Sequence, residues 1–290
     1  MDVIALFGPT GVGKTAVAVG LAELLRARGE EPVAVSADAL QIYEGLETLT
    51  GVASAAERAR LEHRLVSFLA VTESYSAGAF AERAHSEIDG LLAEGRRPIV
   101  VGGTGLYLRA ALAELDLRPP VDTAAYAERP ASALHAELAE RAPHLAGRLD
   151  PADPRKLARS LALLDVGVEY PPADEQLWTK HTRHPTLLVA LTMERDALNA
   201  AIGARVDAMV AGGAADEVRR AAAAGASAGA RQALGFEELL ADDAETMKLR
   251  TRQYAKRQMT WLRKLSGAHV IDVTDRSPED VAAEIGSLLA

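Results

Sequence analysis

The residues with the clearest chemical potential lie between positions 3 and 15. Residues 3–7 form an apolar run typical of a buried strand, and the next eight read Gly-Pro-Thr-Gly-Val-Gly-Lys-Thr. The spacing G-x-x-x-x-G-K-[ST] lets backbone N–H groups surround a phosphate without hindrance from β-carbons. A helix that begins at the lysine adds the positive end of its dipole to the same site. We therefore predict that a phosphorylated ligand binds at Gly8, Pro9, Thr10, Gly11, Val12, Gly13, Lys14 and Thr15.

Two side chains of this loop have distinct predicted roles. The Lys14 ammonium is expected to reach the outer phosphate, and the Thr15 hydroxyl to hold a Mg²⁺ ion. Asp38 is a third candidate, because it follows a second apolar run over residues 32–36. Ligands of parallel α/β sheets bind at the carboxyl ends of the strands, which predicts that Asp38 lies beside the phosphate loop. A helix cap or a turn is the alternative role for an aspartate at such a position.

A third strand is predicted at residues 99–101, and it ends in Gly102-Gly103-Thr104-Gly105. A hydrolysing P-loop ATPase usually places a Mg²⁺-binding aspartate after such a strand. The glycines found here argue against a motor or a switch. They leave open a transferase in which the phosphate is the leaving group.

Residues 248–264 contain seven cations and no acidic residue, in a chain whose net charge is −9. At about 100° per residue, one helical stripe collects Met247, Tyr254, Gln258, Trp261 and Leu265. The cations fall on two ridges beside it, namely Lys248, Arg252, Lys256 and Arg263 on one side and Arg250, Arg257 and Lys264 on the other. A docked helix with solvated cations is one interpretation. We favour a helix that lines a path for a polyanion, because clustered cations are an electrostatic footprint.

The order of predicted elements is that of an α/β protein. Further strands are expected at residues 65–69, 186–192 and 269–273, and helices at 14–28, 77–93, 106–115, 154–164 and 278–289. We predict a P-loop NTPase-like, mostly parallel sheet flanked by helices, with a small, mainly helical insertion. The core comprises residues 1–118 and 151–290, the insertion residues 119–150, and the basic helix residues 246–265.

Composition narrows the functional classes further. The chain has no cysteine, which excludes disulfides and thiolate metal sites, and His181 and His184 lack the partners of a metal site. No apolar run approaches the roughly 18 residues of a membrane helix, and the first strand leaves no room for a signal peptide. We expect a cytoplasmic protein with no membrane partner. The absence of a long apolar seam favours a monomer.

Several motifs together resemble the tRNA dimethylallyltransferases, also called tRNA isopentenyltransferases. Beside the phosphate loop, the similar segments are residues 36–43, Ser-Ala-Asp-Ala-Leu-Gln-Ile-Tyr, and 102–107, Gly-Gly-Thr-Gly-Leu-Tyr. Residues 75–80, 232–238 and 251–263 add three more in the family's order. The chain departs from the family pattern at residues 62–67 and around Gly51.

The resemblance implies transfer of a dimethylallyl group from dimethylallyl diphosphate to N6 of an adenosine beside the anticodon of tRNA. It implies that Lys14, a Mg²⁺ ion on Thr15 and Arg195 stabilise the departing diphosphate, and that Asp38 is the general base. The tRNA-binding residues that it implies are Asp38, Ala39, Leu40, Gln41, Thr104, Arg155, Lys156, Arg159, Arg252 and Lys256.

Three alternatives remain open at this point. An isopentenyltransferase that acts on free adenine nucleotide shares the phosphate loop, but it needs neither the insertion nor the basic helix. A small-molecule kinase is supported by the loop alone. A non-catalytic P-loop binding module is compatible with the departures from the family pattern.

Overall fold

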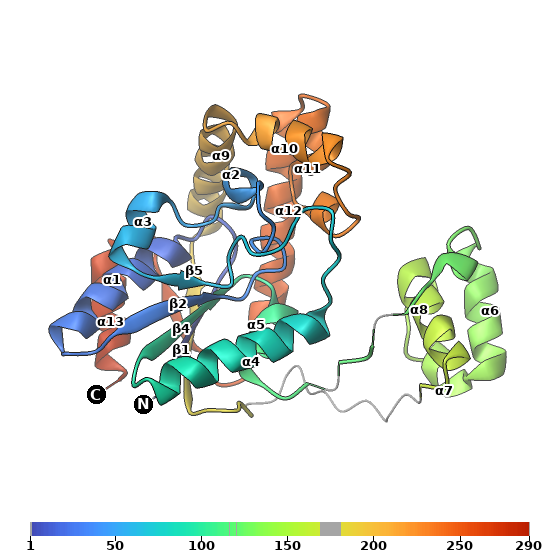
Figure 1. Ribbon diagram of the computed structural model, residues 1–290, viewed down its shortest axis with the longest axis horizontal. Coiled ribbons are helices and arrows are strands. Elements are labelled where there is room, and N and C mark those ends of the chain that lie inside the picture. Colours follow the sequence, from blue (N-terminus) through green and yellow to red (C-terminus); the bar gives the residue numbers. More distant parts are fainter. Residues whose placement is uncertain (1, 116, 120, 169–180, 290) are drawn as a thin grey trace. The chain divides into compact units, whose positions relative to one another are not determined.

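A six-stranded sheet, in the strand order β3-β2-β4-β1-β5-β6, forms the centre of the larger of two compact units, which comprises residues 1–116 and 176–290 (Figure 1). The structure is a computed structural model that describes residues 2–115, 117–119, 121–168 and 181–289. All strand pairs are parallel, as predicted. The strands are β1 Val3–Phe7, β2 Pro32–Ser36, β3 His63–Arg64, β4 Arg97–Gly102, β5 Thr186–Thr192 and β6 His269–Asp272.

Helices cover both faces of this sheet. The chain moves from β1 to β2 in one direction along the sheet and from β3 to β4 in the other, so right-handed crossovers place the connecting helices on opposite faces. Helix α1 (Lys14–Ala27) packs with α13 (Pro278–Ser287), and α4 (Ala77–Ala93) packs with α5 (Gly105–Leu112). The described helices include none with both the length and the apolar character that crossing a bilayer requires.

The remaining helices of this unit gather above the carboxyl ends of the strands. They are α2 Glu47–Thr50, α3 Ala55–Arg60, α9 Arg195–Ala211, α10 Ala214–Ala223, α11 Phe236–Leu240 and α12 Ala244–Leu262. Parts of several of them share a second apolar core, which contains Leu49, Val218, Phe236 and Met247. Residues far apart in sequence therefore meet where a parallel sheet binds ligands.

Residues 117–175 form a second compact unit. Its described helices are η1 Ala124–Tyr126, α6 Ala131–Arg141, α7 Pro143–Ala146 and α8 Pro154–Asp165. Leu157 and Leu161 of α8 pack with Leu134 and Leu138 of α6 in a core of their own. This second unit therefore extends past residue 150, the predicted end of the insertion.

The prediction of a strand at residues 65–69 is wrong. The edge strand β3 is only His63–Arg64, and Leu69 contributes one isolated bridge to Tyr43. Leu65 and Ser67 have φ angles of 58° and 45°, and this left-handed backbone interrupts an extended strand.

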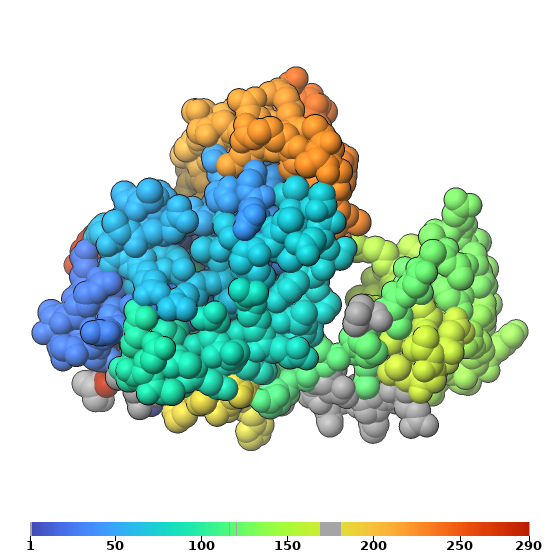
Figure 2. Space-filling model, in the orientation of Figure 1, coloured from blue at the N-terminus to red at the C-terminus, as the bar shows by residue number. Residues whose placement is uncertain are grey.

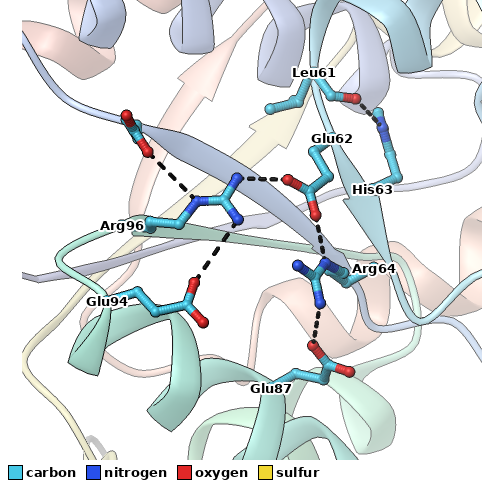
Figure 3. Close-up of polar contacts among 8 residues, drawn as sticks. Leu61, Glu62, His63, Arg64, Glu87, Glu94 and Arg96 are labelled. Atoms are coloured by element: carbon cyan, nitrogen blue, oxygen red, sulfur yellow. Dashed lines mark hydrogen bonds and ion pairs between the residues drawn. The ribbon is translucent and has the colours of Figure 1, made fainter.

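A network of ion pairs surrounds the start of β3 (Figure 3). Arg96 binds Glu62, Arg64 binds both Glu62 and Glu87, and the two arginines hold the pKa of Glu62 below its usual range, Arg96 more strongly. Glu62 precedes β3 and Arg96 precedes β4, so this network lies at the amino ends of the strands. The departure from the family pattern at residues 62–67 begins in this network and continues to the carboxyl end of the sheet, where the backbone N–H of Ser67 donates to the carbonyl oxygen of Gln41.

Candidate functional site

A cavity of about 590 Å³ opens at the carboxyl ends of the strands. The phosphate loop, the residues after β2, a strap of residues 47–58 and helices α9 and α12 line it. Its charged lining side chains are Lys14, Asp38, Glu47, Glu57, Arg58 and Arg205. Its apolar lining includes Leu40, Leu49, Val52, Val206, Met209, Leu234 and Met247. The cavity thus offers both cations for an anion and an apolar wall.

The phosphate loop has the backbone that its sequence predicts. Gly11 and Gly13 have φ angles of 86° and 91°, a region in which residues with a β-carbon are strained. The Lys14 ammonium donates to the carbonyl oxygens of Gly8 at 2.9 Å and Pro9 at 3.0 Å. Thr15 also lines the cavity.

The Lys14 ammonium has a perturbed pKa. The pKa is lowered from 10.5 to about 8, mainly by burial and to a smaller extent by the positive charge of Arg205, while the negative charge of Asp38 opposes both effects. A bound anion would favour the charged form of this lysine.

Asp38 lies beside the loop, as the position after β2 predicts, and it lines the same cavity as Lys14. Its Oδ1 accepts a hydrogen bond from the backbone N–H of Leu40 at 2.9 Å. The turn that was the alternative role for Asp38 is therefore present as well. Oδ2 accepts no hydrogen bond from the described residues, and it remains available to a ligand.

Besides the exposed Arg58, the cavity is lined by the half-buried Arg205, which lies two to three turns into α9. Arg195 is the first residue of α9, exposed and outside the lining of the cavity. Burial lowers the pKa of the Arg205 guanidinium, while Asp38 and Glu57 raise it. The structure therefore does not bring Arg195 to the phosphate loop, although it brings Arg205 there.

The strap is attached at several points to the rest of the unit. The carboxylate of Glu217 on α10 accepts the backbone N–H groups of Thr48 and Leu49, both at 2.9 Å. Gln41 donates to the carbonyl oxygen of Gly51 at 3.1 Å. Figure 2 shows this segment, in blue, directly against the orange segment of α10 and its neighbours. The strap is thereby held over the cavity.

The other predicted substrate residues divide into two groups. Leu40 and Gln41 line the cavity, whereas Ala39 and Thr104 do not. The Thr104 hydroxyl forms a hydrogen bond of 2.8 Å with the hydroxyl of Tyr254, which does line it. Burial raises the pKa of Tyr254, and the negative charge of Asp38 acts in the same direction, so Tyr254 is a neutral hydrogen-bonding group near Asp38.

Helix α12 has the predicted apolar stripe, but some of its cationic side chains form ion pairs with acidic side chains. Met247 and Gln258 are buried, as the stripe requires. Lys248 is paired with Asp207 and Glu245, and Arg250 with Glu238. Arg252 and Lys256 are exposed, and neither pairs with an acidic side chain in the part of the chain that the structure describes.

The three predicted cations of α8 belong to the second unit. Arg155 and Lys156 are exposed, with the Lys156 ammonium 3.6 Å from Asp153. Arg159 donates to the carbonyl oxygens of Arg118 at 3.2 Å and Pro119 at 3.3 Å. Their predicted role toward RNA stays a prediction.

Sequence reasoning missed Arg205, Tyr254 and Gln258 as site residues. Arg205 had a signal, because it stands three and four residues from Ile202 and Met209 on the apolar stripe of α9. Gln258 had a similar one, as an amide on the apolar stripe of α12. A polar side chain on a buried stripe requires a partner, and here the partner is the site.

Comparison with known proteins gives a consistent result. Residues 41–265 match the family described as IPP transferase. The chain is 35% identical over 309 residues to a tRNA dimethylallyltransferase from Kineococcus radiotolerans, covering 100% of this chain and 96% of the relative. A full-length tRNA isopentenylpyrophosphate transferase from Bacillus halodurans superposes with a TM-score of 0.72 at 30% identity, covering 99% of this chain and 95% of the other. A eukaryotic dimethylallyltransferase acting on tRNA superposes with a TM-score of 0.79 at 26% identity, covering 99% and 77%. The chain therefore belongs to the IPP transferase family.

Proposed function

We propose that this protein transfers a dimethylallyl group from dimethylallyl diphosphate to N6 of an adenosine next to the anticodon in tRNA, releasing diphosphate. The observation that carries the proposal is one cavity that contains the phosphate loop, the half-buried Arg205 and the carboxylate of Asp38. Family membership and the tRNA substrate in the names of the relatives support it.

The cavity suits an allylic diphosphate. Backbone N–H groups of the loop, Lys14 and Arg205 would bind the diphosphate and stabilise the charge that grows on it as the bond to carbon breaks. The apolar side chains of Leu49, Val206 and Met209 offer a wall for the short hydrocarbon chain. The volume of the cavity, about 590 Å³, lies within the range of roughly 300–1,000 Å³ usual for small-molecule sites.

Asp38 would act as the general base. The adenosine must leave its stack to present its exocyclic amine. Nitrogen N6 attacks the allylic carbon, the bond between that carbon and the diphosphate oxygen breaks, and the amine proton passes to the carboxylate of Asp38. General-base assistance of this kind is worth about 10²–10⁴-fold in rate. The hydroxyl of Tyr254, which lines the cavity, is hydrogen-bonded to the hydroxyl of Thr104 and would limit where the adenine ring can sit.

The lining of the cavity is compatible with a Mg²⁺ ion. The Thr15 hydroxyl and the Asp38 carboxylate both line it, and Mg²⁺ usually takes one or two such protein oxygens together with phosphate oxygens and water. Among the described residues, no group of three or more acidic or histidine side chains could hold a metal ion. When bound, the ion would supply charge neutralisation to the diphosphate.

RNA would approach along α12. Three exposed cations of that helix have no acidic partner among the described residues, and they are Arg252, Lys256 and Arg257, the last of which lies 5.5 Å from the ring of Tyr254. Arg252 and Lys256 each lie two residues from Tyr254, which lines the cavity, so a phosphate bound by them would lie near the site. We further propose that the protein acts as a cytoplasmic monomer.

A transfer assay tests the proposal. The protein is incubated with Mg²⁺, dimethylallyl diphosphate labelled in its hydrocarbon chain, and tRNA, AMP or no acceptor. We expect label in tRNA only, and none in a tRNA that has guanosine in place of the adenosine beside the anticodon. Label in AMP would overturn the proposal in favour of a free-nucleotide enzyme. No transfer to any acceptor would favour a kinase or a binding module.

A further inference from the structure

Gln258 connects three segments that are remote in sequence. Its side chain is 4% exposed, and it reaches from α12 into the carboxyl end of the sheet. Its Oε1 accepts the backbone N–H of Thr10 in the phosphate loop at 2.9 Å. Its Nε2 donates to the carbonyl oxygen of Gly103, in the turn after β4, at 2.7 Å.

Both loops depend on this contact for their relative position. A β-carbon at Gly103 would lie 2.4 Å from Nε2 of Gln258 and 3.2 Å from the carbonyl oxygen of Gly8. The phosphate loop and the turn after β4 are therefore packed together with the amide of Gln258 against both. Only a side chain with a donor and an acceptor at the same end can satisfy a backbone N–H and a backbone C=O at once.

The same helix carries the exposed cations. Arg252 and Lys256 precede Gln258 on α12, and Tyr254 of this helix contacts Thr104, the residue after Gly103. The helix segment 252–258 is thus connected to the phosphate loop through Gln258 and to the turn after β4 through Gln258 and Tyr254. A shift of α12 would break at least one of these hydrogen bonds.

We propose that Gln258 is a positioning residue that couples the phosphate loop to the RNA-binding helix. Diphosphate on the loop and RNA on α12 then require the same arrangement of Thr10, Gly103 and α12, and each ligand strengthens binding of the other. The coupling is reciprocal, because both ligands stabilise one state. The inference rests on the proposed function for the identity of the two ligands, but not on turnover.

Binding measurements test the inference with inorganic diphosphate as the probe. The dissociation constant of diphosphate is measured by calorimetry, with Mg²⁺, in the absence and presence of saturating tRNA. For the unaltered protein we expect tRNA to tighten diphosphate binding about 5-fold or more. In Gln258→Met we expect diphosphate alone to bind about 10-fold more weakly, since two hydrogen bonds are lost, and the effect of tRNA to disappear. Gln253→Met is the matched control, because Gln253 is exposed on the same helix and should leave both values unchanged.

A second variant and a hydrogen-exchange measurement distinguish a loss of coupling from a general loss of structure. Gln258→Glu keeps an acceptor for Thr10 but cannot donate to Gly103, so it should also lose the coupling while α12 remains folded by circular dichroism. In the unaltered protein, hydrogen exchange of the Thr10 amide should be slow before any ligand is added. A Gln258→Met protein with diphosphate affinity and coupling like those of Gln253→Met, or a rapidly exchanging Thr10 amide, would overturn the inference. If the unaltered protein binds diphosphate but no tRNA, the proposed function fails, whereas the diphosphate affinities of the two variants still decide the role of Gln258.

Discussion

Gly51 of the strap lies against the guanidinium of Arg205. A β-carbon at Gly51 would lie 1.7 Å from Nη2 of Arg205 and 2.7 Å from its Cζ, and Gly51 has a φ angle of 65°. Any other residue at position 51 would have to displace this arginine or move the strap. This half-buried arginine acts electrostatically on Lys14 and Asp38, so the position of a charge in the cavity depends on a residue that has no side chain.

The first prediction concerns this pair. Gly51→Ala should push the Arg205 guanidinium out of place and raise the KM for dimethylallyl diphosphate about 10-fold, with a smaller change in the KM for tRNA. Steady-state kinetics with each substrate varied in turn measures this. Gly45→Ala is the control, since Gly45 has a φ angle of 79° but no atom within 4 Å of its β-carbon position. Equal effects at both positions would show that backbone strain alone is responsible.

The second prediction separates the two arginines of α9. Arg205→Ala should weaken diphosphate binding about 10- to 100-fold, because a half-buried cation in the cavity is lost. Arg195→Ala should change it less than about twofold, since Arg195 is exposed outside the lining. Calorimetry with diphosphate on both variants gives the comparison. The reverse ranking would restore the role that sequence resemblance implied for Arg195.

The third prediction concerns Asp38. Asp38→Asn keeps the size and the hydrogen bond to Leu40 but removes the base, so kcat should fall at least about 100-fold while tRNA affinity stays within about twofold. Single-turnover transfer and filter binding measure the two quantities. Glu47→Gln, which removes another carboxylate from the lining, should retain most of the activity. Near-normal turnover in Asp38→Asn would remove Asp38 as the base.

The fourth prediction is a pH dependence that arises from Lys14. The free protein has a Lys14 pKa of about 8, so the ammonium is charged below that pH and loses its proton above it. Affinity for dimethylallyl diphosphate should be nearly constant well below pH 8, be reduced about twofold at pH 8, and then fall by up to about tenfold per pH unit. Lys14→Arg keeps its charge throughout this range, so its affinity should not decline. A decline of equal size in both proteins would assign the titration to another group.

The fifth prediction concerns the salt dependence of tRNA binding. Replacing Arg252 and Lys256 together by Gln should weaken binding and reduce the slope of log K against log salt by about 1.5. Lys248→Gln is the control, because the Lys248 ammonium is 2.7 Å from Asp207 and 2.8 Å from Glu245 and is not available to RNA. An unchanged slope in the double variant would mean that these two cations face solvent in the complex.

The sequence by itself determined the parts that depend on neighbouring residues. The phosphate loop follows from glycines at positions with left-handed backbone, which few other residues tolerate. Asp38 could be placed beside Lys14 because the carboxyl ends of parallel strands share one edge. The limits of α4 and β5 also agree with the predicted 77–93 and 186–192, since capping residues and apolar runs are local signals.

Only the tertiary structure decided which distant residues complete the site. Arg205 reaches the cavity and Arg195 does not, because the part of α9 that lines the cavity lies within residues 205–209 and not at its first residue. Thr10 and Gln258 are 248 positions apart, and no local pattern relates them. The same holds for Glu217, whose carboxylate holds the strap. Such contacts depend on how whole elements pack, and packing is determined by the complete chain and not by any single segment.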